Sequence, residues 1–279
     1  MENNIKAFED DSSTNIDKIK SARDNLQEIE DDSFANIYNM KNKDEYSYKT
    51  IGLTEDVIKD ISKQKNEPNW MLDLRLKALE MFNKLNMPTW GPDLSELDMS
   101  KIATYVKPKT DMKKSWKDVP DEIKNTFDAL GIPEAEKESL AGVGAQYDSE
   151  IVYHSIKDEL VKQGVIYTDF DEAVRKYPDV IKQYFMKCVP MSDHKFVALH
   201  YAVWSGGSFV YVPKGVKVDI PLQSYFRLNA PGAGQFEHTL IIVDEGASLH
   251  FIEGCSAPKY NEINLHAGCV ELFVKDNAY

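Results

Sequence analysis

Cys255 and His266 are the residues of this 279-residue chain whose types are best suited to chemistry. A cysteine thiolate is a soft ligand for iron and sulfide, and it can also carry a persulfide. Gly254 and Ser256 flank Cys255 and give it little steric cover. A neutral imidazole binds iron and titrates near physiological pH. Cys255 is therefore a candidate for sulfur or metal handling, and His266 is a candidate second ligand or proton shuttle.

Arg227 and Asn229 are candidates for recognising an anion. They stand two positions apart, so in a strand they face the same side. If that side is the interior, a buried arginine needs an anionic partner, such as a persulfide or sulfide in transit. Each of the four residues also has a structural alternative: a small buried cysteine, a hydrogen-bonded strand histidine, or a surface salt bridge.

The remaining candidates of this region are expected to be structural. We predict core positions for Cys188 and Cys269. We predict ordinary strand histidines at His238 and His250. We predict solvated strand carboxylates at Glu237, Glu253 and Glu271. Three cysteines, an odd number without CxxC spacing, argue against a disulfide framework and a structural zinc site.

The elements that must position these residues include a repeat. Val212, Val243 and Val274 each begin a similar string and lie 31 residues apart (243 − 212 and 274 − 243). Three positions after each valine stand Gly215, Gly246 and Asn277, which are residue types that accept positive φ. A fixed period with one tight corner per unit is typical of a solenoid, and strand-forming units favour a β-helix. The alternative is coincidence among common Val-x-x-Gly strings.

Before this region the chain is expected to be mainly helical. Thr54 is suited to cap one helix, Pro68 to begin a second, and Pro120 a third that ends near Gly131. Further helices are predicted within 151–163, 170–177 and 181–188, and an irregular stretch over 93–118. We thus predict an α+β fold with three parts: a polar, mobile segment (1–45), a mainly helical region (46–204) and the start of a parallel β-helix (205–279). The third unit stops at Tyr279, so we expect the β-helix to be incomplete there.

Charge and hydropathy restrict the function. A net charge of −13 disfavours nucleic acid and anionic membranes as partners. No apolar stretch is long enough to span a bilayer, and the first residues lack the pattern of a signal peptide. We therefore expect a cytoplasmic protein.

Several strings resemble the SufB branch of the SufB/SufD family of iron–sulfur cluster assembly proteins. The resemblance extends from about Tyr46 to Tyr279. The strings that carry it are Asn66-Glu67-Pro68-Asn69-Trp70, Tyr211-Val212-Pro213-Lys214-Gly215, Tyr225-Phe226-Arg227-Leu228-Asn229, Gly234-Gln235-Phe236-Glu237-His238, Glu253-Gly254-Cys255-Ser256-Ala257-Pro258 and Leu265-His266-Ala267.

The resemblance implies a scaffold subunit rather than an enzyme. Its partners would be the SufC ATPase, the SufD paralogue, the sulfur donor of a cysteine desulfurase system and recipient apoproteins. Its cargo would be a transient iron–sulfur cluster, expected to be 4Fe–4S, and some members associate with reduced flavin. The family's carboxy-terminal sulfur-accepting cysteine has no counterpart in this sequence.

Two other functions stay open. The chain could be a SufB-like interaction module that builds no cluster. It could also be a β-helix enzyme acting on polysaccharides, although no acidic spacing of that kind repeats.

Overall fold

The computed structural model describes residues 46–129 and 140–279. Its strands are β1 (Tyr46–Ile51), β2 (Ala103–Pro108), β3 (Gly142–Tyr147), β4 (Glu150–Ile156), β5 (Ile166–Asp169), β6 (Ser208–Val212), β7 (Lys217–Arg227), β8 (Gly234–Gln235), β9 (His238–Val243), β10 (Ser248–Ser256), β11 (Leu265–His266) and β12 (Cys269–Val274). Its helices are α3 (Glu55–Gln64), α4 (Asn69–Lys84), α5 (Asp121–Ala129), α7 (Asp158–Lys162), α8 (Phe170–Lys176), α9 (Pro178–Tyr184), α10 (Lys195–Val203) and the 3-10 helix η2 (Trp116–Asp118). The segment 1–45, predicted to be mobile, and the predicted cap Gly131 lie outside the described residues.

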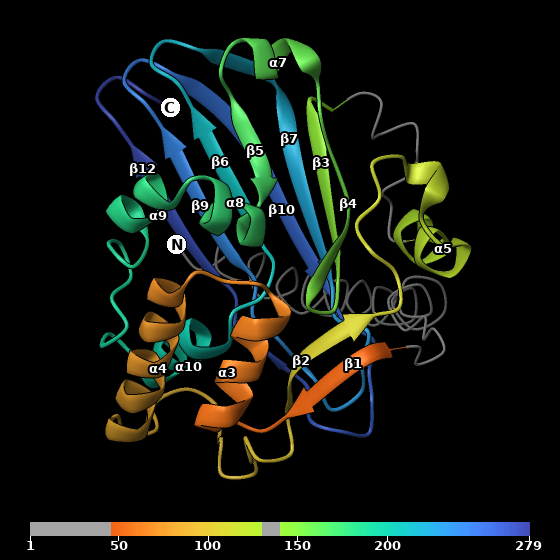
Figure 1. Cartoon of the computed structure of the whole chain (residues 1–279), viewed down its shortest axis with the longest axis vertical. Coiled ribbons are helices and arrows are strands. Elements are labelled where there is room, and N and C mark those ends of the chain that lie inside the picture. The colour runs from red at the N-terminus through yellow and green to blue at the C-terminus, as the bar shows by residue number, and fades with distance from the viewer. Residues whose placement is uncertain (1–45, 130–139) are drawn as a thin grey trace, which may run out of the picture. The chain divides into compact units, whose positions relative to one another are not determined.

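Two four-stranded sheets form the larger part of the described structure. Their strand orders are β10-β7-β3-β4 and β12-β9-β6-β5, and the pairs β1-β2 and β11-β8 form small additional sheets. Figure 1 shows the long strands in the upper part of the view, with α3, α4 and α10 gathered below them. The mixed α+β fold is thereby confirmed. The proposed division at residue 205 stays a prediction, and strands occur on both sides of it.

The 31-residue repeat corresponds to parallel pairing at a constant register. Val243 pairs with Val212 on one side and with Val274 on the other. The corner residues Gly215, Gly246 and Asn277 have φ of 73°, 65° and 58°. The predicted stacking of the valines and the predicted positive φ of the corners are both confirmed.

A bulge in β7 changes this register before Cys255 is reached. Leu249 pairs with Val218, but Phe251 pairs with Leu222, so the interval falls from 31 to 29 residues. Pro221 lies in the bulged stretch and has no N–H to donate to the ladder. The shift places Cys255 opposite Phe226.

Two predictions of local structure were wrong. Residues 151–156, predicted to be helical, belong to β4, which pairs with β3 through a tight turn at Asp148, whose φ is 54°. The stretch 93–118, predicted to be irregular, contains β2, which pairs with β1. In both cases pairing with a neighbouring strand outweighs a weak local preference.

Helices α3, α4 and α10 form a packed layer around a buried ion pair. Thr54 caps α3 as predicted, because its side chain accepts from the N–H of Val57. The fully buried Arg75 of α4 binds Glu67 and the carbonyl oxygens of Ala202 and Trp204 at the end of α10. Within residues 46–129 and 140–279, no helix combines the length and apolar character needed to cross a bilayer.

Candidate functional site

Cys255 lies near the end of β10, an edge strand of its sheet, and is exposed. Alternate residues of a strand share a face, so Phe251, Glu253 and Cys255 point the same way. Phe251 packs against the core cluster that contains Leu222. The thiol therefore belongs to the inward face of β10 but remains accessible at the sheet edge.

His266 of β11 forms an ion pair with the buried carboxylate of Glu237. The distance between Nε2 of His266 and Oε1 of Glu237 is 2.5 Å. Glu237, through this hydrogen bond, raises the pKa of His266 above its ordinary value. A Cβ on Gly268 would lie 2.5 Å from the same oxygen. The absence of a side chain at residue 268 therefore makes room for this pair.

Glu253 is the second carboxylate near the thiol. It accepts a hydrogen bond from Oγ1 of Thr239 at 2.7 Å. Burial, with Glu237 nearby, raises the pKa of Glu253 to about 7. Burial, together with the charges of Glu237 and Glu253, also raises the pKa of the Cys255 thiol. The same two carboxylates thus act on both Cys255 and His266.

These four side chains combine the groups that handle iron and sulfur. Oε2 of Glu237 is buried and has no hydrogen-bond partner among the described residues. A carboxylate oxygen, an imidazole and a thiol are all ligand types for iron. Glu253, with a pKa of about 7, is a titratable group two residues from the thiol on the same face of β10.

Arg227 and Asn229 occupy the neighbouring end of β7. Arg227 is fully buried, and its Nη1 donates to Oγ of Ser256 at 3.0 Å. Since Arg227 pairs with Ser256 in the ladder, it faces the side opposite to Cys255. Burial lowers the pKa of Arg227.

The side chain of Asn229 is buried with neither Oδ1 nor Nδ2 bonded to a described residue. Its backbone is fixed, because its N–H donates to Oδ1 of Asp148 at 2.6 Å. The structure thus brings Cys255 and His266 to one pair of carboxylates and places Arg227 and Asn229 beside them, around Ser256 and Asp148.

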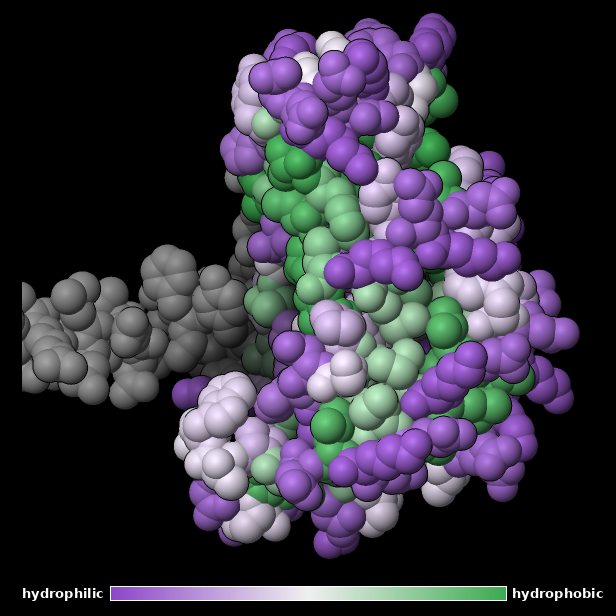
Figure 2. Space-filling model, turned by 90° about the vertical axis from the view of Figure 1, so that its left-hand side faces the viewer, coloured by the Kyte–Doolittle hydropathy of each residue, from purple (hydrophilic) through white to green (hydrophobic). Residues whose placement is uncertain are grey.

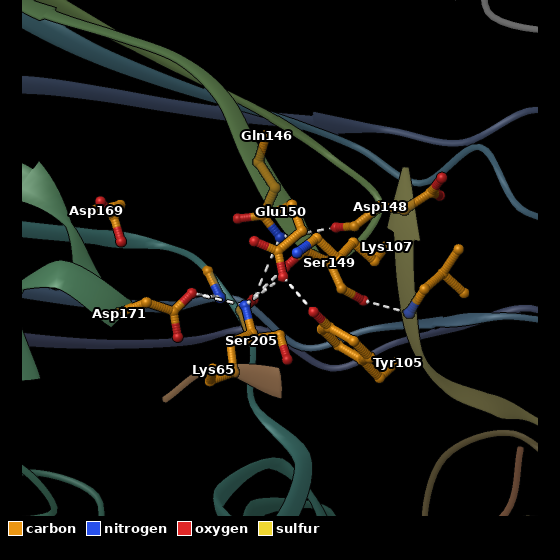
Figure 3. Close-up of polar contacts among 12 residues, drawn as sticks. Lys65, Tyr105, Lys107, Gln146, Asp148, Ser149, Glu150, Asp169, Asp171 and Ser205 are labelled. Carbon is orange, nitrogen blue, oxygen red and sulfur yellow. Dashed lines mark hydrogen bonds and ion pairs between the residues drawn. The ribbon is translucent and has the colours of Figure 1, made fainter. Parts of the chain in front are cut away.

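A second polar cluster lies where α3 meets β2, β4 and α8. Figure 3 shows the amine of Lys65 between Asp171 and Glu150, with Tyr105 also bonded to Glu150. Nζ of Lys65 is 2.7 Å from Oδ2 of Asp171 and 3.0 Å from Oε1 of Glu150. Burial opposes the charged form, but Asp171 and Glu150 raise the pKa of Lys65 above its ordinary value. This amine therefore stays ionised within the core.

The Lys65 cluster adjoins a cavity of about 400 Å³, which Lys107, Asp169 and Arg175 also line. Burial and the neighbouring Asp171 raise the pKa of Asp169 to about 7. Because the cluster joins four elements of the fold, we interpret it as a structural junction.

Three residue environments differ from those predicted. Cys188 is exposed rather than part of the core. Glu237 and Glu271 are buried rather than solvated. Glu237 and Glu253, which the sequence reasoning set aside, are the residues that link Cys255 to His266. Glu253 stands two positions before Cys255, and Glu237 stands 29 positions before His266, close to the repeat interval. These spacings could have indicated that both carboxylates lie near the site.

Comparisons with known proteins place this arrangement in a family. Residues 23–224 match the model described as "SufBD protein N-terminal region", and residues 226–279 match "SUF system FeS cluster assembly, SufBD core domain". Iron–sulfur cluster assembly SufBD family proteins of Staphylococcus aureus, strain MRSA252, and Staphylococcus haemolyticus are 56% and 57% identical over 228 residues. That alignment covers 82% of this chain and 49% of each relative, so the chain spans about half the length of the curated relatives it matches. The chain belongs to the SufBD family of iron–sulfur cluster assembly proteins.

Proposed function

We propose that this protein is a scaffold component for iron–sulfur cluster assembly, with Cys255 as a sulfur-handling residue and His266 as a second ligand. The observation that carries the proposal is the grouping of Glu237 and Glu253 around both of these side chains. Iron and sulfide are cargo in this proposal, which the family assignment supports.

The sulfur step uses the thiol of Cys255 and a nearby base. Glu253 accepts the thiol proton, since its pKa of about 7 leaves part of it ionised at neutral pH. The thiolate then attacks the outer sulfur of a donor persulfide. A sulfur–sulfur bond forms at Cys255, the donor's bond breaks, and the donor leaves as a thiolate.

The roles of the remaining site residues follow from their charge. Oε2 of Glu237 and the imidazole of His266 are suited to bind Fe²⁺ next to that sulfur. Arg227 and the amide of Asn229, which bonds no described residue, are suited to hold an anionic sulfur species on the adjoining face. A 4Fe–4S cluster is the expected product.

We further propose the SufB type within the family, a cytoplasmic location, and assembly with SufC and SufD. A desulfurase system would supply sulfur, and apoproteins would receive the cluster. The constant 31-residue register of β6, β9 and β12 supports a parallel β-helix as the architecture of the strand region.

The test is anaerobic reconstitution of the full-length protein with Fe²⁺ and sulfide, followed by absorption and Mössbauer spectroscopy. Cys255→Ser is nearly isosteric and should preserve the fold while lowering the cluster yield. Cys188→Ser, at another exposed cysteine, is the matched control and should keep the wild-type yield. An unchanged yield in Cys255→Ser would assign that cysteine a structural role.

A second candidate function is that of an interaction module without cluster-building activity. The supporting observation is the edge strand β12, on which Val270, Leu272 and Val274 are 50%, 52% and 49% exposed. Figure 2 shows a band of hydrophobic residues between hydrophilic margins on the side of the molecule where β12 lies. This function would be favoured if the wild-type protein yields no cluster on reconstitution and the Cys255→Ser protein still binds a partner.

A further inference from the structure

A second group of possible metal ligands lies in the core, apart from Cys255. It consists of His200 in α10, His238 at the start of β9 and Cys269 at the start of β12. Their ligand atoms all lie within 4.8 Å of one another. His200 and His238 are buried, and Cys269 is partly exposed.

The parallel ladder explains how these residues meet. Cys269 is the Cα partner of His238, because β12 pairs with β9 at the 31-residue interval. Neighbouring strands lie about 4.8 Å apart, so paired side chains on one face are close. His200 reaches the pair from the last turn of α10, with its Nε2 3.0 Å from Nδ1 of His238.

The hydrogen bonds around the two histidines allow a tautomer in which both rings direct a lone pair at one point. Nδ1 of His200 lies 2.7 Å from the carbonyl oxygen of Ala267, so it must carry a proton and leave the lone pair on Nε2. Nε2 of His238 has no hydrogen-bond partner among the described residues and faces the carboxylate of Glu271 at 3.4 Å. A proton there leaves the lone pair on Nδ1. In this tautomer the two lone pairs face each other and can bind one cation together; in the other tautomer the same 3.0 Å contact is an N–H···N hydrogen bond.

Glu271 fits the role of an outer carboxylate that orients a metal-binding histidine. It is fully buried and accepts hydrogen bonds from the backbone N–H groups of Met186, Cys188 and Val189. Metal-bound histidines usually present their second nitrogen to such an acceptor. A divalent ion, one thiolate and one carboxylate would also sum to zero charge, which suits a buried site.

An entry route is present. A cavity of about 520 Å³ is lined by His200, Cys269, His266 and apolar residues such as Val189 and Phe196. His200 and Cys269 thus face a space through which an ion can arrive. Two imidazoles and one thiolate favour ions of the zinc class, and a water can take a fourth position.

We propose that His200, His238 and Cys269 bind a divalent transition metal ion of the zinc class, at a site distinct from Cys255. Zinc–nitrogen and zinc–sulfur bonds of roughly 2.0–2.3 Å put tetrahedral ligand atoms about 3.3–3.6 Å apart. The 3.0 Å nitrogen contact and the 4.8 Å limit bracket this spacing.

The test uses Co²⁺ as a spectroscopic probe on the full, reduced, chelator-treated chain. We expect one equivalent to give tetrahedral ligand-field bands and a thiolate-to-cobalt charge-transfer band, both removed by Zn²⁺. Cys269→Ser should abolish the charge-transfer band. His200→Asn and His238→Gln should weaken binding by more than the roughly 10–100-fold typical of losing an outer-sphere partner.

The controls separate this site from the proposed function. Cys255→Ser and His250→Gln should keep the Co²⁺ spectrum. Loss of the band in Cys255→Ser, or its retention in Cys269→Ser, would overturn the proposal. Nitrogen-15 NMR of the wild-type histidines gives a second readout that needs no variant. Zn²⁺ should shift Nε2 of His200 and Nδ1 of His238, whereas an imidazolium at His238 that Zn²⁺ leaves unchanged would contradict the site.

Discussion

Nζ of Lys65 lies 2.7 Å from Oδ2 of Asp171, and both side chains are almost completely buried. Removing one partner of a buried ion pair leaves the other charge buried without compensation. Lys65→Met should therefore lower the free energy of unfolding by about 3–5 kcal/mol. Chemical denaturation followed by circular dichroism measures this. The control is Lys59→Met, at an exposed helical pair with Glu55, which should leave the denaturation midpoint unchanged. Equal effects of both changes would refute the assigned role.

The raised pKa of Asp169 predicts a pH dependence of stability. In the unfolded chain an aspartate titrates near about 4, whereas in the folded state the pKa is about 7. Between these values the folded protein binds more protons, so its stability should fall as pH rises from about 4 to about 7. Asp169→Asn should reduce this slope, as measured by denaturation across the pH range. The exposed Asp219→Asn should retain it.

Gly268→Ala should disturb the pair formed by His266 and Glu237. The added Cβ would lie 2.5 Å from Oε1 of Glu237 and must displace that carboxylate. Because Glu237 raises the pKa of His266, the pKa should fall toward its ordinary value. Histidine NMR titration measures the change. Glu237→Gln should lower the same pKa without adding bulk, and a pKa that is insensitive to both changes would disprove the coupling.

Asn229→Leu should increase stability while impairing cluster assembly. The buried amide of Asn229 has no hydrogen-bond partner among the described residues, so replacing it with an apolar side chain should raise the free energy of unfolding by about 1 kcal/mol. Asn264→Leu is the matched control. Its amide bonds the N–H of Gly232 and the carbonyl oxygen of Ala230, so that variant should be less stable. A destabilised Asn229→Leu protein would indicate a structural amide.

We expect the exposed edge strand β12 to promote self-association of the chain, and Leu272→Lys to reduce it. Leu272 is 52% exposed on the edge strand β12, and a charged residue on such an edge opposes pairing with another chain. Sedimentation velocity over a range of concentrations measures the effect. Val161→Lys, at a residue of α7 that is 51% exposed, should change association little. Similar reductions in both variants would point to net charge rather than to the edge.

The strand repeat could be predicted because parallel strands that pair at a constant interval carry similar residues at that interval in the sequence. The same interval also links His238 to Cys269, so two of the three proposed metal ligands were implicit in the repeat. The spacing rule for zinc does not detect this pair, because it searches for neighbouring cysteines. His200 could not be predicted, since its position depends on how α10 packs.

The burial of Glu237 and Glu271 could not be predicted from the sequence, because it too depends on tertiary contacts. Glu271 is stabilised by backbone N–H groups of residues 186–189, which lie more than 80 positions away. Glu237 depends on His266 and on the space at Gly268. The bulge at Pro221 moved Cys255 two ladder positions, and no rule of composition gives the size of such a shift.

The strand order also has a consequence for synthesis of the chain. In the order β5-β6-β9-β12, each strand joins the edge left by the strand before it, and β3, β7 and β10 follow one another in the same way. A ribosome delivers these strands in that sequence. Each new strand can therefore pair with a strand edge that is already formed. This topology favours stepwise folding from the amino-terminal side during translation.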